Sequence, residues 1–198
     1  MGRQPKFEQA VVVDNAMGVF WRQGYAGTSP QLLVEELGIG KGSLYNTFDS
    51  KHNLFTLALR GYCMMRTQAL TAQLGGPGAV RPRLRAAIAE LTGVGSHSLG
   101  CLMVNAVTEL AREDASVAEL GRSLFERIEE VFRDAVERGQ RSGQLGQGDP
   151  SAAASSLLTT VIGISVLARA GADEKRLNRL IDAAIERLLP CPEVPDEP

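Results

Sequence analysis

The sequence predicts an all-α fold of about nine helices. Three observations support this prediction. Apolar residues recur at intervals of three and four along most of the chain, and no segment shows the strict alternation of a half-buried strand. Ala, Leu, Glu and Arg, which favour helix, are plentiful, whereas aromatic residues make up only 5% of the chain. Breaks rich in Gly and Pro divide the 198 residues into separate helices.

The first expected helix extends from about residue 7 to residue 23, and two short helices follow at residues 30–37 and 41–48. Ser29 is the expected N-cap of the first short helix, whose opening residue is a proline that loses no hydrogen bond there. Glycines in the turn at residues 38–40 tolerate unusual backbone angles. These elements form a helix-turn-helix, which presents its second helix to the DNA major groove.

The second short helix, residues 41–48, has one inward face, formed by Leu44 and Phe48. Its other side chains are small or form hydrogen bonds, and such a surface can lie close to base edges and phosphates. These outward residues are Lys41, Gly42, Ser43, Tyr45, Asn46 and Thr47. Lys41, Ser43 and Asn46 are the candidates for contact with base edges.

Several short motifs occur together in this region: residues 20–25 (FWRQGY), Thr28-Ser29, Leu33, residues 38–45 (GIGKGSLY), Phe48 and Ser50-Lys51. In this combination the chain resembles, from about residue 8 to residue 55, the DNA-binding domain of the TetR/AcrR family of bacterial transcriptional repressors. Two positions depart from the family pattern. Gly40 stands where Ser or Thr usually caps the recognition helix, and Asn46-Thr47 replaces common aromatic or His residues. The operator sequence therefore cannot be copied from a relative.

The resemblance implies a helix-turn-helix DNA-binding domain at residues 1–53. A C-terminal helical ligand-binding and dimerisation domain is expected at residues 54–190, with a flexible tail at residues 191–198. It also implies that Tyr45 contacts a phosphate or a thymine, although the ring could instead only pack. Lys51 lies at a helix N-terminus, which suits phosphate binding, and its alternative is a solvated surface charge. Thr28 and Ser29 are expected to combine capping with phosphate contacts.

Six further helices are expected, at about residues 50–73, 83–92, 101–112, 116–141, 150–170 and 174–189. Asp149 and Pro150 open the fifth of these helices, and Asp173 caps the sixth. The last two form the candidate oligomer surface, because the helix at 150–170 is apolar on more than one face and must be buried from several sides. A monomer core is the alternative. A dimer can read two half-sites about a helical turn or more apart, and the resemblance implies a four-helix bundle between subunits, which favours a homodimer.

The second domain contains candidate residues for an effector pocket, since apolar walls with one or two polar groups suit a small molecule. Plain core packing is the alternative for each of them. Asn105 is the best single candidate because it interrupts an apolar run and its amide needs a partner. The candidates are Tyr62, Met65, Met103, Asn105, Phe125, Ile128, Phe132, Leu158 and Ile162.

Cys101 is a further candidate for the effector site. A thiol at a helix N-terminus feels the positive end of the helix dipole, which favours the thiolate. The segment resembles the Gly-Cys-Leu-x-x-Asn segment of one branch of the TetR/AcrR family, a few members of which are associated with sensing electrophiles or oxidants. A small buried core residue is the alternative. Cys63 is expected to be core and Cys191 exposed.

Composition limits the other possibilities. The net charge of −2 excludes a broadly basic coat for nucleic acid, so phosphate contacts must be local. The N-terminus lacks the apolar core of a signal peptide, and the apolar run at residues 157–168 is expected to be too short and too polar to span a bilayer. Three cysteines without an export signal indicate reduced thiols. A cytoplasmic protein without membrane contact is expected.

The sequence thus favours a ligand-responsive DNA-binding regulator. We expect a repressor, with an activator as the alternative, that binds a palindromic operator in double-stranded DNA as a homodimer and is released by a small-molecule effector or by thiol modification. The alternative is an all-helical enzyme or a small-molecule carrier. His52 and His97 show no metal-ligand spacing, and the chain has no Gly-x-Ser-x-Gly elbow or phosphate loop. No catalytic residue, metal or cofactor is therefore expected.

Overall fold

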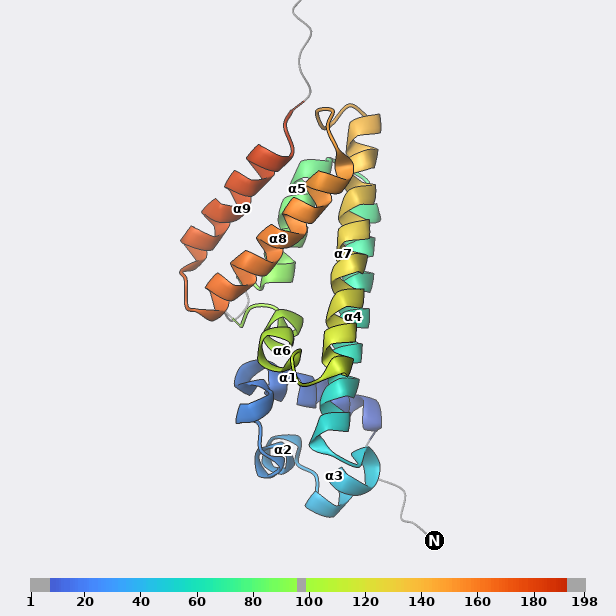
Figure 1. Cartoon of the computed structure of the whole chain (residues 1–198), viewed down its shortest axis with the longest axis vertical. Coiled ribbons are helices and arrows are strands. Elements are labelled where there is room, and N and C mark those ends of the chain that lie inside the picture. The colour runs from blue at the N-terminus through green and yellow to red at the C-terminus, as the bar shows by residue number, and fades with distance from the viewer. Residues whose placement is uncertain (1–7, 96–98, 192–198) are drawn as a thin grey trace, which may run out of the picture. The chain divides into compact units, whose positions relative to one another are not determined.

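The computed structural model of the chain describes residues 8–95 and 99–191. Within these residues it contains nine helices and no strand, which confirms the predicted fold class (Figure 1). His97 and the predicted tail beyond residue 191 lie outside the described residues. The helices are α1 (Gln9–Gly27), α2 (Pro30–Leu37), α3 (Lys41–Phe48), α4 (Lys51–Gly75), α5 (Val80–Thr92), α6 (Leu102–Leu110), α7 (Ala115–Arg141), α8 (Pro150–Arg169) and α9 (Glu174–Leu188).

Three predicted helix starts are confirmed by side-chain caps. Ser29 Oγ accepts the N–H of the residue three positions on at 3.1 Å, and the carboxylates of Asp149 and Asp173 each accept a backbone N–H at 2.8 Å. The end of α1 differs from the expectation near residue 23. Its backbone breaks at Gly24, at φ 75° and ψ 172°, and the helix then continues to Gly27.

The chain folds into two compact units. The first comprises Met1–Met65 and Leu102–Gly121, and the second comprises Arg66–Cys101 and Arg122–Pro198. Helix α6 and the start of α7 therefore belong to the same unit as the helix-turn-helix. The predicted domain boundary near residue 53 follows function rather than compactness, and it stays a prediction.

The first unit has an aromatic core beneath the helix-turn-helix. The rings of Phe20 on α1 and Phe55 on α4 meet edge to face with centroids 4.9 Å apart, and Trp21 meets Tyr62 in the same way at 5.3 Å. Helix α1 packs against both α2 and α6. This core supports the two short helices, since neither of them, at eight residues, buries enough apolar surface to be stable alone.

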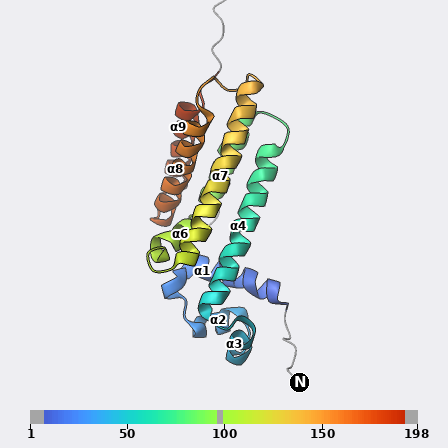
Figure 2. The same cartoon turned by 45° about the vertical axis from the view of Figure 1, so that its right-hand side comes forward.

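In the second unit, α5, α8 and α9 pack against one another, and α8 and α9 lie side by side (Figures 1 and 2). Ala154, Leu157 and Val161 of α8 are buried, as are Leu177 and Ile181 of α9. Each of these positions repeats at intervals of three or four, so the stripes that the sequence shows are the packed faces of the two helices.

Helix α8 is the one helix in the described part of the chain that is long and apolar enough, by length and composition, to cross a membrane. An 18-residue window of this 20-residue helix has a mean hydropathy of 1.7, so the expectation drawn from the shorter run at residues 157–168 was too restrictive. Because α8 packs on α5 and α9, its apolar character is that of a helix in contact with several neighbours.

Candidate DNA-binding site

The turn between α2 and α3 is fixed by apolar side chains. Leu33, Leu44 and Phe48 are buried, and so is Ile39 in the turn. Gly38 ends α2 in the left-handed conformation, at φ 63° and ψ 27°, which a residue with a Cβ rarely adopts. The position of α3 relative to α2 is therefore set by packing and by this glycine.

Helix α3 presents a polar surface to solvent. Lys41, Gly42, Ser43 and Asn46 are exposed, and the ring of Tyr45 is 38% exposed although tyrosine is commonly half-buried. Thr47, on the edge of this face, is half-buried. The structure thus brings the six predicted α3 residues onto one accessible surface, which is the arrangement that base readout requires.

The end of α3 is joined to the start of α4 by local hydrogen bonds. The N–H of Asp49 donates to the carbonyl of Tyr45 at 2.9 Å, and Asp49 adopts a φ of 60°. The side-chain amide of Asn53 donates to the carbonyl of Phe48 at 3.1 Å, while its backbone N–H donates to Ser50 Oγ at 3.0 Å. Ser50 therefore caps α4, and Asn53 connects α4 to α3.

Two predicted phosphate contacts have other partners in the structure. Thr28 is 0% exposed, and its hydroxyl donates to the carbonyl of Gly24 at 2.6 Å. Lys51 Nζ donates to the carbonyls of Tyr25 and Thr28, both at 3.0 Å, and lies 4.0 Å from the centre of the Tyr25 ring. DNA contacts by these two side chains stay predictions, and their present bonds oppose them. Ser29 is exposed at the start of α2.

A carboxylate of α6 binds the broken end of α1, which the sequence reasoning did not anticipate. Glu109 accepts the backbone N–H groups of Tyr25 and Ala26, at 3.0 Å and 2.6 Å. Glu109 lies 84 residues from Tyr25 along the chain, so no local pattern could have indicated the contact. The FWRQGY motif at residues 20–25 does contain Gly24, the residue at which α1 breaks.

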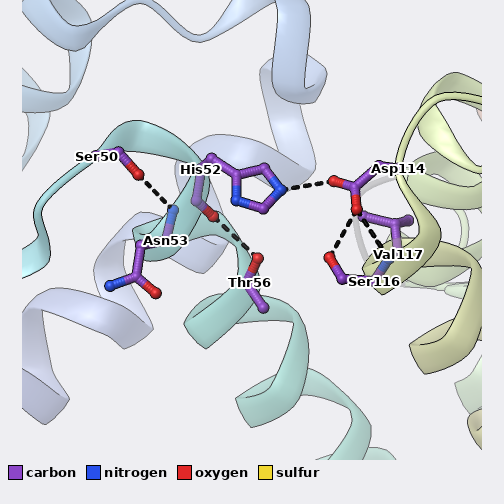
Figure 3. A network of polar contacts seen from close by, with 7 residues as sticks. All are labelled: Ser50, His52, Asn53, Thr56, Asp114, Ser116 and Val117. Carbon is purple, nitrogen blue, oxygen red and sulfur yellow. Dashed lines mark hydrogen bonds and ion pairs between the residues drawn. The ribbon is translucent and has the colours of Figure 1, made fainter.

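A second carboxylate connects α4 to α7 (Figure 3). Asp114 accepts from His52 Nε2 at 2.6 Å and, at the start of α7, from the hydroxyl and backbone N–H of Ser116 at 2.7 Å and 2.9 Å. The Ser116 hydroxyl, followed by His52 and the backbone N–H groups of Val117 and Ser116, lowers the pKa of Asp114 from 3.8 to about 2. A sequence pattern can predict that an aspartate just before a helix caps it. It cannot predict that a histidine far away in the chain binds the same aspartate.

The predicted effector residues are divided between the two units. Tyr62 and Met103 are fully buried in the first unit, where Asn105 is half-buried and Met65 is exposed. In the second unit, Ile128 and Phe132 are buried, and Phe125, Leu158 and Ile162 are half-buried. Their role in binding an effector stays a prediction.

A hollow of ≈260 Å³ lies elsewhere in the second unit, where the loop between α7 and α8 meets the end of α9. Gln140, Asp149 and Arg187 supply its polar wall, and none of the predicted effector residues lines it. Across the described ranges, no three His, Cys, Asp or Glu side chains come close enough to hold a metal ion.

Cys101 directly precedes α6 and is 6% exposed. Gly100 before it adopts φ 67°, and a Cβ there would lie 2.5 Å from the carbonyl oxygen of Ser165 on α8. The backbone beside the thiol is therefore packed directly on α8 within the second unit. Cys63 is half-buried and Cys191 is exposed, and none of the three cysteines forms a disulfide.

Comparison with known proteins gives two matches to family models. The N-terminal model of bacterial regulatory proteins of the tetR family matches residues 12–75, and a tetracyclin repressor-like C-terminal domain matches residues 80–184. Together they cover the whole helix-turn-helix and most of the second unit. The first match contains all of the predicted α3 surface.

Individual relatives agree with the family models. The chain is 30% identical over 195 residues to YezE of Bacillus subtilis, an uncharacterised HTH-type transcriptional regulator, covering 95% of this chain and 100% of the relative. It is 29% identical over 194 residues to the repressor ComR of Escherichia coli, covering 96% and 92%. A cysteine-substituted CifR, solved with 26-bp operator DNA, superposes with a TM-score of 0.80 at 28% identity, covering 96% of this chain and 100% of that one.

Proposed function

The chain belongs to the TetR family of bacterial regulatory proteins, whose members regulate transcription and are not enzymes, and we propose that it represses genes next to a palindromic operator. It binds this operator as a homodimer and leaves it when an effector binds or a thiol is modified. The observation that carries the proposal is the exposed polar face of α3 on a turn fixed by buried side chains. The operator complex of the CifR relative supports it.

In this proposal α3 reads bases in the major groove. Lys41, Ser43 and Asn46 contact base edges, because an ammonium suits guanine acceptors and an amide suits adenine. Tyr45 contacts a phosphate or a thymine methyl group. Ser29, exposed at the N-terminus of α2, adds a phosphate contact, since free N–H groups and the helix dipole favour an anion there.

Helices α8 and α9 form the dimer interface in this proposal. They leave large apolar side chains outside the packed faces, with Val166 48% exposed and Leu180 37% exposed. The same surface on a second copy would cover them through a two-fold axis. A dimer is also what two-fold operator symmetry requires, because one helix-turn-helix reads only a few base pairs.

The effector of the proposed repressor is a small molecule, and Asn105 supplies the polar group that binds it. Modification of Cys101 is the second route to release. A group added to this thiol would have to displace the packing of Gly100 on α8, whereas the burial of the thiol slows the modification itself. A protein that binds an operator acts in the cytoplasm, as is typical of the family.

Selection of bound sequences from a random duplex library, with reduced and ligand-stripped protein at a stated salt near physiological, tests the proposal. We expect a palindrome with two half-sites. Tyr45→Ala and Asn46→Ala should then weaken binding to it, each by about 1–3 kcal/mol. Arg127→Ala, at an exposed position on α7 outside the proposed dimer interface, is the control. Failure to enrich any sequence under these conditions would reject the repressor function.

A further inference from the structure

The α1–α2 turn, residues 24–28, connects the first helix to the helix-turn-helix. Because Gly24 leaves helical geometry, the N–H groups of Tyr25 and Ala26 no longer point along the α1 hydrogen-bond ladder. Both are bound by the carboxylate of Glu109. A Cβ at Gly24 would lie 3.1 Å from Glu109 Oε2, so the close approach of this carboxylate uses the absent side chain.

The other end of the α1–α2 turn is bound by a cation. Lys51 Nζ, at the start of α4, is an ammonium that accepts no hydrogen bond, and it donates to the carbonyls of Tyr25 and Thr28. Ser29, the next residue after the turn, is the N-cap of α2. The carboxylate thus meets N–H groups of the turn and the ammonium meets its carbonyls, so each charge is opposite in sign to the partial charge that it contacts. The entry to α2 is therefore fixed by α6 on one side and α4 on the other.

The two charges also act on each other. Burial lowers the pKa of the Lys51 ammonium, and the Glu109 carboxylate acts in the opposite direction, favouring the charged lysine. Burial, followed by the charges of Asp114 and Glu109, raises the pKa of Tyr25 and keeps its phenol neutral. Glu109 is exposed, so its removal would leave the two backbone N–H groups to water and would take away a charge that favours the Lys51 ammonium.

We propose that Glu109 is a positioning residue for operator binding: by holding the α1–α2 turn it sets the direction in which α6 and the helix-turn-helix present α3. The inference rests on the proposed function, since it requires an operator. Glu109 itself needs no contact with DNA. In a dimer, an error in the direction of each α3 changes the separation of the two reading heads, so the fit to half-site spacing depends on Glu109.

The test compares Glu109→Ala and Glu109→Gln with the matched control Glu113→Gln, which removes the same charge at an exposed position beyond the end of α6. Affinity is measured for the selected operator and for versions with one base pair added to or removed from its centre. Thermal unfolding of each variant gives the fraction of folded protein. Glu109→Gln, which retains one acceptor oxygen, serves if the alanine variant does not fold.

We expect Glu109→Ala to bind the selected operator roughly tenfold more weakly or worse, and Glu109→Gln to fall between it and the wild type. The loss of affinity caused by the altered half-site spacing should be smaller in both Glu109 variants than in the wild type. In Glu113→Gln this loss should equal that of the wild type. Equal loss on all spacings would mean that Glu109 only stabilises the fold, and affinity within about twofold of the wild type would also overturn the proposal. A wild type that selects no operator would instead reject the proposed function.

Discussion

The two ends of the first unit use polar side chains in opposite ways. On α3, Lys41, Ser43 and Asn46 are exposed and available to a partner. Around the α1–α2 turn, Lys51 and Glu109 bind backbone groups of the protein itself. The comparison teaches that a lysine in a DNA-binding motif can serve recognition or support, and that only the position of its nitrogen decides between them.

The largest effect expected on the supporting end comes from Gly24→Ala. Gly24 has a φ of 75°, which strains any L side chain, and the new Cβ would press on Glu109 Oε2. We expect a loss of about 1–3 kcal/mol in the free energy of unfolding, measured by urea denaturation.

Gly27→Ala is the matched control for this change. A Cβ at Gly27 would meet only Gln23 Cβ, at 3.8 Å, an ordinary contact. Alanine at this site should therefore be neutral, or stabilising by up to about 1 kcal/mol, because it favours helix over glycine. Equal destabilisation by both changes would show that the backbone at Gly24 and its contact with Glu109 are not special.

A smaller effect should separate Lys41 from Lys51. Lys41→Ala removes a proposed contact to a guanine edge, so the free energy of operator binding should weaken by about 1 kcal/mol and discrimination at that base pair should relax. Lys51→Ala should leave the slope of log affinity against log salt unchanged and lower the free energy of unfolding by about 1 kcal/mol, since two carbonyls lose a charged donor. The measurements are operator titration at several salt concentrations and urea denaturation.

Arg127→Ala again serves as the control, because this arginine is exposed on α7 and lies outside the proposed dimer interface. A reduced salt slope for Lys51→Ala, without loss of stability, would instead show that Lys51 leaves the carbonyls to bind a phosphate. The phosphate contact predicted from the resemblance would then be right, and the contrast between the two ends of the unit would disappear.

These residues also show how far the sequence could predict the structure. Ser29, Asp149 and Asp173 were recognised as caps because a cap bonds to a backbone N–H only two or three residues away. The inward and outward faces of α3 followed from helical periodicity alone. Both features are local, and the family motifs of the helix-turn-helix are local as well.

The supporting contacts could not be predicted in the same way. Lys51 turns towards α1 because Gly24 breaks that helix and leaves carbonyls within reach, which depends on tertiary packing. Glu109 lies 84 residues from Tyr25 in the sequence, and Asp114 lies 62 residues from His52. No local sequence pattern predicts a contact between residues so far apart, since a carboxylate on a helix most often faces solvent.

The smallest effect concerns Asp114, which connects His52 to the start of α7 (Figure 3). Its pKa is about 2 in the fold against 3.8 unperturbed, so the unfolded chain binds this proton more readily. The stabilisation is complete above about pH 4 and is lost as the pH falls through about 2. Asp114→Asn should cost up to about 1 kcal/mol at neutral pH and flatten the acid limb of unfolding, whereas Glu113→Gln should leave that limb unchanged. An unchanged acid limb in Asp114→Asn would show that other carboxylates govern acid unfolding and that the α4–α7 connection adds little to the supporting end.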